Sequence, residues 1–208
     1  MSFIGRIIGI MFFNRKQTKN IAEKDDATGQ AWFIIFVGSI IGGILSALAY
    51  QATNDPQYLG FMGSVIIDSL NTGSSTSLIA LTVINFLYQA LFILFLAFVL
   101  SFVGKIFGGK YSTMEVVRII GFASIIGVLS TVVSYAAAIN NTSTLLIIGT
   151  VLTIWQFCVF IYAYSVGGDI GIIRSLIAFI VALIVAVLLL VLIVIFVFVA
   201  IYAALSTI

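Results

Sequence analysis

The sequence predicts an all-α integral membrane protein with five transmembrane helices. Of its 208 residues, 62% are hydrophobic and only 8% are charged, whereas soluble domains carry about 25% charged residues. So few charges cannot cover a water-facing surface. Most of the chain falls into apolar segments that match or exceed the ~20 residues needed to cross a bilayer: 31–50, 78–103, 116–138, 144–164 and 175–204. We expect two further elements, an N-terminal amphipathic interfacial helix and a short outer-face interfacial helix.

Residues 1–30 form a cytoplasmic region distinct from the transmembrane domain at 31–208 in this interpretation. An apolar segment runs from Met1 to Phe13 and is interrupted by Arg6. On a helix, most of its large apolar side chains share one face, so it is suited to lie in the headgroup region. A signal peptide is the alternative, but Arg6 splits the apolar core and no small-residue cleavage site follows. We interpret the basic stretch at 14–30 as a solvated linker close to anionic lipid.

The segment 51–77 lies between the first two spans and contains no Lys or Arg. Asp55 and Pro56 suit the N-cap and first position of a helix, which we expect to end near Asn71 on the outer face. Asp68 lies within this helix, and we expect it to face water.

Three amides lie inside the spans. Asn85 and Gln89 are four residues apart, on one face of the second span, and Gln156 lies near the middle of the fourth. Amides in lipid commonly hydrogen-bond across helices at about 0.6–2 kcal/mol, so we take these three as candidate interhelical polar contacts. Contact with a substrate is the alternative.

The hinge at 104–124 joins the second and third spans. Ser112 and Glu115 have the spacing of a capping box, which predicts that the third helix begins at Thr113. The pattern Gly104-x-x-x-x-Gly109-Lys resembles part of a phosphate-binding loop. However, Tyr111 stands where such a loop requires Ser or Thr, and no strand precedes the pattern.

Basic residues set the expected orientation. All nine Lys and Arg lie in the N-terminal tail, in the hinge up to Arg118, or at Arg174. By the positive-inside rule the N-terminus is cytoplasmic, and five spans then place the C-terminus outside.

The composition excludes several kinds of chemistry. The chain has no His, and its one Cys, Cys158, lies in an apolar run. Intrachain disulfides, zinc sites and Cys–His catalysis are therefore excluded. We find no candidate catalytic, cofactor-binding or metal-ligating residue, and nothing that indicates a nucleic-acid partner. We expect no cofactor and no enzymatic activity.

The hinge and third span resemble the Yip family of Ypt/Rab-interacting membrane proteins. The similar residues are Phe107, Gly108, Gly109, Ser112, Glu115, Val116, Arg118, Gly121, Phe122 and Ser124. The five-span layout resembles the family over nearly the whole chain. The Asp-Leu-Tyr-Gly-Pro motif and the long N-terminal region of eukaryotic members are absent. These departures are typical of the short prokaryotic form, which implies a prokaryotic cell membrane and counts against a Rab-type GTPase as partner.

Three functional hypotheses follow. The resemblance implies a non-enzymatic membrane scaffold or organiser that acts through lipid or a cytosolic protein, alone or in a homo- or hetero-oligomer. The alternative is a small transporter or channel subunit with a polar path near Asn85, Gln89 and Gln156. An intramembrane enzyme is the third, and nothing in the chain would activate a nucleophile. For the first, the candidate partner or lipid contacts are Lys105, Lys110 and Arg118 on the cytoplasmic side, with Tyr111 as an exposed aromatic anchor beside them. The simpler interpretation is that these cations only fix the topology.

Overall fold

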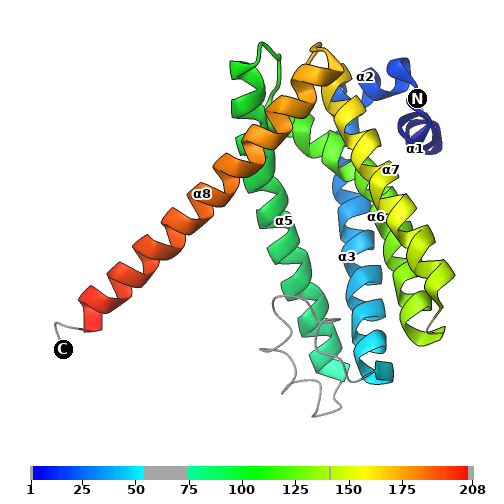
Figure 1. Ribbon diagram of the computed structural model, residues 1–208, viewed down its shortest axis with the longest axis vertical. Helices are drawn as coiled ribbons and strands as arrows, with labels where there is room; N and C mark the ends of the chain where they lie inside the picture. Colours follow the sequence, from blue (N-terminus) through cyan, green and yellow to red (C-terminus); the bar gives the residue numbers. More distant parts are fainter. Residues whose placement is uncertain (1, 54–74, 141, 206–208) are drawn as a thin grey trace.

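The computed structural model describes residues 2–53, 75–140 and 142–205, and within these ranges the chain is helical with no strand. Five of the helices are long and apolar enough to cross a membrane, which confirms the predicted fold class. Figure 1 shows the helices, in chain order: α1 (Phe3–Met11), α2 (Arg15–Glu23), α3 (Asp26–Thr53), α5 (Ser75–Ile106), α6 (Thr113–Asn140), α7 (Ser143–Gly167) and α8 (Ile172–Leu205).

Each spanning helix is longer than the apolar segment that predicted it. α3, for example, begins at Asp26 and ends at Thr53, beyond both ends of the expected span 31–50. Hydropathy marks only the part that lies in hydrocarbon, while the helix continues through its polar ends. The expected outer-face helix, including Asp68, lies outside the described residues.

Small residues bring the central helices close together. α6 packs on both α3 and α7. A Cβ atom built on Gly121 of α6 would lie 2.7 Å from Cβ and 3.0 Å from Cα of Ala31 on α3. The turn between α6 and α7 is very short, because α6 ends at Asn140 and α7 begins at Ser143. The two helices are therefore antiparallel neighbours, as the sequence predicts.

α8 contacts the bundle over only part of its length. Its buried stripe is Ala178, Ala182 and Ala186, the contact stripe that the sequence predicts, and it packs in a cluster with residues of α5. Beyond Ala186 the helix leans away from the other helices (Figure 1), and its side chains from 187 to 199 are exposed. In a membrane this half of α8 faces lipid.

α2 corrects the prediction of a solvated linker at 14–30. Asn14 caps it by accepting a hydrogen bond from the Gln17 N–H at 3.2 Å. One face is buried, through Thr18, Ile21 and Ala22, and it packs on α6 and α7. The spacing of these three residues brings them onto one side of a helix. The division of the chain at residue 30 stays a prediction.

Candidate functional site

All nine Lys and Arg residues lie at one end of the bundle, which we call the basic end. This end carries α1, α2, the loop 107–112 and the loop between α7 and α8 (Figure 1). Two of the nine, Arg6 and Arg118, are buried, and they decide how α1 and α2 are held.

Arg6 joins α1 to both α2 and α3. Its side chain is only 1% exposed. Nε donates to Asn20 Oδ1 at 3.0 Å, Nη1 to Gln30 Oε1 at 2.7 Å, and Nη2 to the two Asp26 carboxylate oxygens at 2.9 and 3.0 Å. Because its three nitrogens bond three partners on two helices, the Arg6 guanidinium is fixed in direction as well as in distance, so α1 has a defined position.

Arg118 performs the same task for α6. Nε donates to Thr28 Oγ1 at 2.7 Å, Nη1 donates to the Ala22 carbonyl at 2.6 Å, and Nη2 pairs with Asp25. The side chain is 6% exposed. The expectation that Arg118 is available to a partner or to lipid is therefore wrong, because the turn between α2 and α3 covers it.

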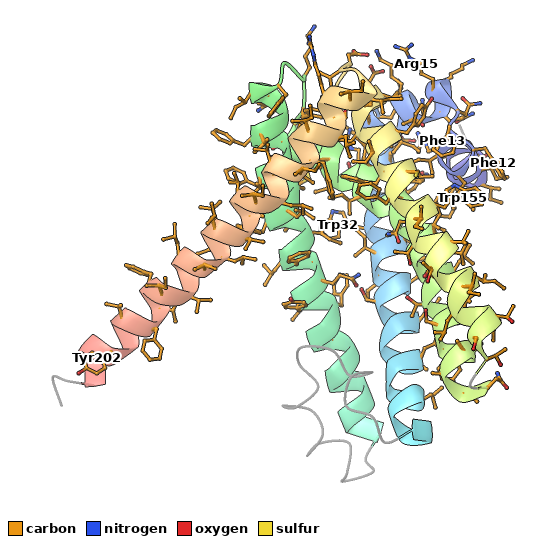
Figure 2. The ribbon with its side chains drawn as sticks, viewed as in Figure 1. Phe12, Phe13, Arg15, Trp32, Trp155 and Tyr202 are labelled. Atoms are coloured by element: carbon orange, nitrogen blue, oxygen red, sulfur yellow. The ribbon has the colours of Figure 1, made fainter. Side chains whose placement is uncertain are left out.

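We call α1 and α2 together the N-terminal unit. Besides the two arginines, α7 holds it: Trp155 Nε1 donates to the Met11 carbonyl at 3.1 Å, and the Phe12 ring packs edge-on against Trp155 (Figure 2). The outer face of α1 is apolar, with Ile4 66%, Ile8 53% and Phe12 65% exposed. These three residues are four apart and form one stripe along the helix.

α2 presents a basic surface at the same end of the molecule. Arg15 and Lys16 are exposed, and with Lys19, Asn20 and Glu23 they line a shallow surface hollow. Lys19 Nζ lies 3.1 Å from Asp169 in the loop between α7 and α8, which ties α2 to that loop.

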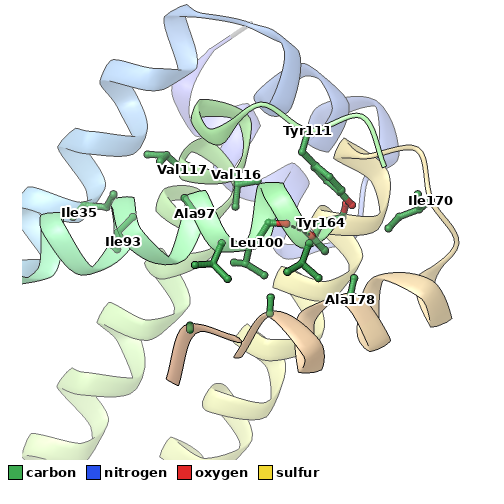
Figure 3. Close-up of a cluster of buried hydrophobic side chains, with 14 residues drawn as sticks. Ile35, Ile93, Ala97, Leu100, Tyr111, Val116, Val117, Tyr164, Ile170 and Ala178 are labelled. Atoms are coloured by element: carbon green, nitrogen blue, oxygen red, sulfur yellow. Dashed lines mark hydrogen bonds between the residues drawn. The ribbon is translucent and has the colours of Figure 1, made fainter. Parts of the chain in front are cut away.

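Tyr111 is buried, which corrects the expectation of an exposed aromatic anchor. It is 3% exposed and stacks on Tyr164 with ring centroids 4.4 Å apart (Figure 3). Its hydroxyl donates to the Tyr164 carbonyl at 2.7 Å, and the Tyr164 hydroxyl donates to the Leu100 carbonyl at 2.7 Å. Burial raises the pKa of the Tyr111 phenol.

Three glycines make room for the Tyr111 ring. A Cβ atom on Gly168 would lie 2.0 Å from Tyr111 Cζ, and one on Gly109 would lie 2.2 Å from Cε2. One on Gly104 would lie 2.5 Å from Cε2. No residue with a side chain fits these positions unless the ring moves.

Of the candidate partner contacts in the hinge, Lys105 and Lys110 are exposed. The capping box beside them forms as predicted: Ser112 N–H donates to Glu115 Oε2 at 2.8 Å, and Glu115 N–H donates to Ser112 Oγ at 3.1 Å. Whether the two lysines bind a partner stays a prediction.

The structure brings Gln89 and Gln156 to one cavity inside the bundle. Its volume is about 310 Å³, and α3, α5, α6 and α7 line it. Ser39 Oγ of α3 contacts the Gln89 amide of α5. The side chain of Asn85 lies outside the described part of the structure. In that part, no group of three or more His, Cys, Asp or Glu could hold a metal ion.

Comparison with known protein families shows to which family this chain belongs. A family model described as the Yip1 domain matches residues 8–207. The chain belongs to the Yip1 family. The match begins inside α1 and extends past the end of α8, so this Yip1-domain protein is a multi-pass membrane protein in which the N-terminal unit and the bundle belong to one family domain. No curated protein and no solved structure matches the chain.

Sequence reasoning missed the contacts that hold the N-terminal unit of this Yip1-domain protein. Arg6 in an apolar segment was the available signal, since a charge so close to hydrocarbon needs a partner. Glu23, Asp25 and Asp26 were the nearest acidic residues in the sequence to supply one. The contact between Trp155 and Met11 had no signal in the sequence.

Proposed function

We propose that this Yip1-domain protein is a non-enzymatic organiser of membranes whose N-terminal unit acts on one leaflet. One observation carries the proposal: the basic end of the molecule carries both the exposed apolar stripe of α1, which Arg6 holds in place, and the exposed basic surface of α2. Amphipathic helices of this kind bind where acyl chains meet headgroups, and their binding depends on curvature and on anionic lipid.

The physical effect follows from where the unit lies. α1 packs against α6 and α7 at the basic end only, so it adds volume to one leaflet. A leaflet that takes up extra volume gains area relative to the other leaflet, so the bilayer curves with the expanded leaflet on its convex side. Arg15 and Lys16 attract anionic phosphates at about 1 kcal/mol each. The protein would therefore concentrate in, and stabilise, curved anionic membrane.

We place the basic end in the cytoplasm, in the cell membrane of a prokaryote. The nine basic residues at this end support that orientation through the positive-inside rule. A reporter active only in the cytoplasm is expected to work when fused before Met1 and to fail when fused after Ile208. Activity of both fusions would contradict a five-span topology.

Reconstitution into vesicles tests the function itself. With rising protein content, the wild type is expected to lower the mean vesicle diameter seen by cryo-electron microscopy, more strongly with anionic lipid. Ile4→Ser/Ile8→Ser is expected to lose most of this effect because both residues are on the exposed stripe. The matched control Ile172→Ser/Ile173→Ser also changes two exposed isoleucines at the basic end, but on a spanning helix, and should behave as the wild type.

A second pair of variants tests the charged surface. Arg15→Gln/Lys16→Gln is expected to remove the preference for anionic vesicles, whereas Lys105→Gln/Lys110→Gln is expected to keep it. If the hinge lysines set the lipid preference instead, the proposed role of α2 is wrong. If neither the stripe variant nor the Arg15/Lys16 variant changed the vesicle diameter, the proposal as a whole would be contradicted.

A further inference from the structure

The cavity between α3, α5, α6 and α7 lies near the middle of the spanning helices that line it. Gln156 is next to the central residue of α7, and the lining residues of α6, from Ser124 to Thr131, surround the centre of that helix. Small residues create the space. A Cβ atom on Gly127 would lie 2.9 Å from both Nε2 and Oε1 of Gln156, so the amide of Gln156 rests on the bare backbone of α6.

The lining is uncharged and rich in hydrogen-bond acceptors. Ser124 donates its hydroxyl proton to the Gly121 carbonyl at 2.7 Å, and Thr131 donates to the Gly127 carbonyl at 2.9 Å. Their oxygen lone pairs stay available to the cavity. The Gln156 amide adds two donors and one acceptor. No ionisable side chain lines the cavity.

Hydrocarbon is a poor occupant for such a space. A buried polar group left without a partner costs about 1–3 kcal/mol, and an acyl chain offers no partner. The volume of about 310 Å³ would hold on the order of ten waters at ~30 Å³ each. An anion is also a poor occupant because the lining provides no positive charge.

We infer that this cavity is a hydrated binding site for a small uncharged solute that carries several hydroxyl or amide groups, a molecule of the polyol class. Hydroxyl donors on the solute would meet the oxygens of Ser124 and Thr131, while an acceptor on it would meet the Gln156 amide. Midplane sites between helices are typical of transporters, and the site does not depend on the role proposed for the N-terminal unit.

Access to the cavity has a structural basis. α5 and α7 both line it, and they meet toward the basic end, where the Tyr164 hydroxyl donates to the Leu100 carbonyl. The lining residues enclose the cavity only in part.

The native Cys158 provides a matched control for a thiol-labelling test. It lies two residues from Gln156 on α7 but is exposed on the outer surface of the bundle, where lipid surrounds it. Water-soluble thiol reagents react with the thiolate, which forms only where water reaches. Ser124→Cys, made with Cys158→Ala, places a thiol in the cavity by a nearly isosteric change, and Ser130→Cys is a second variant should the first not fold.

In proteoliposomes, the cavity thiol is expected to react with neutral 2-hydroxyethyl methanethiosulfonate about tenfold faster than Cys158 does in the wild type. Glycerol is expected to slow this reaction, and a positively charged reagent of similar size to react more slowly. Gly127→Leu, added to Ser124→Cys, should fill the cavity and suppress labelling. Labelling no faster than that of Cys158 would overturn the hydrated cavity. Fast labelling without protection by glycerol would overturn the solute site, and equal labelling by the charged reagent would overturn its uncharged character.

Discussion

Replacing Tyr111 with Ala is expected to lower the free energy of unfolding by about 3–5 kcal/mol, the range for removing a large aromatic side chain from a core. The ring is 3% exposed and stacks on Tyr164. Its hydroxyl also satisfies the Tyr164 carbonyl. Tyr111→Phe keeps the stack and loses only the hydrogen bond, so it should cost about 0.5–1.5 kcal/mol. Unfolding in mixed detergent micelles would measure both changes.

The glycines around Tyr111 provide a sharper test of the same packing. Gly168→Ala places a methyl group where the Tyr111 ring lies, so it should destabilise strongly, whereas Gly171→Ala in the same loop meets nothing within 4 Å. In the double variant Tyr111→Ala/Gly168→Ala the clash is absent, so the two losses should fall short of additivity by about 1 kcal/mol or more. Equal effects of Gly168→Ala and Gly171→Ala would show that the ring is not packed there.

Replacing Arg6 with Met is expected to release the N-terminal unit from the bundle. The change leaves Asn20 and Gln30 without their shared partner, and removing one member of a buried ion pair costs about 3–5 kcal/mol. We expect the lower end of that range because Asp26 is 62% exposed and water can solvate it. Fluorescence of Trp155, measured with Trp32→Phe, should change as Met11 and Phe12 move away from the indole.

Two further variants separate geometry from charge at this position. Arg6→Lys keeps the charge but cannot reach all three partners at once, so it should restore less than half of the lost stability. Lys105→Met, an exposed cation at the end of α5, should leave Trp155 fluorescence unchanged. Trypsin should cut at Arg15 and Lys16 faster in Arg6→Met than in the wild type. Identical cleavage would mean that Arg6 does not hold the unit in place.

The parts of the fold that the sequence predicts depend on local information. Hydropathy within one segment identifies a span, and Ser112 and Glu115 are three residues apart, so their capping box is readable directly. The Ala stripe of α8 also repeats within one helix. The Asn14 cap of α2 was equally local, but the polar composition of the segment hid its short buried face.

Whether the charged and aromatic residues at the basic end are buried or exposed depends on partners that are distant in the sequence. Arg6 meets Asp26 from 20 residues away, and Arg118 meets Asp25 from 93 away. Tyr111 fits only because Gly168 lies beside it in space. A single sequence gives no measure of such distances, so Arg118 and Tyr111 were expected to be exposed. The sequence offered a polar path near Gln89 and Gln156 as an alternative, but it could not show that the two side chains line one cavity.

The free half of α8 makes the molecule adaptable to bilayer thickness. With 34 residues, the helix is about 51 Å long at 1.5 Å per residue, well beyond the ~30 Å hydrocarbon core of a typical bilayer. A strong tilt would fit this length into the bilayer, and Figure 1 shows α8 inclined to the other helices. Because the side chains from 187 to 199 are exposed, this half of the helix can bend relative to the half that packs on α5 while the contacts of Ala178, Ala182 and Ala186 stay in place. In a thicker membrane the free half would stand more upright, and in a thinner one it would spread outward and occupy more area.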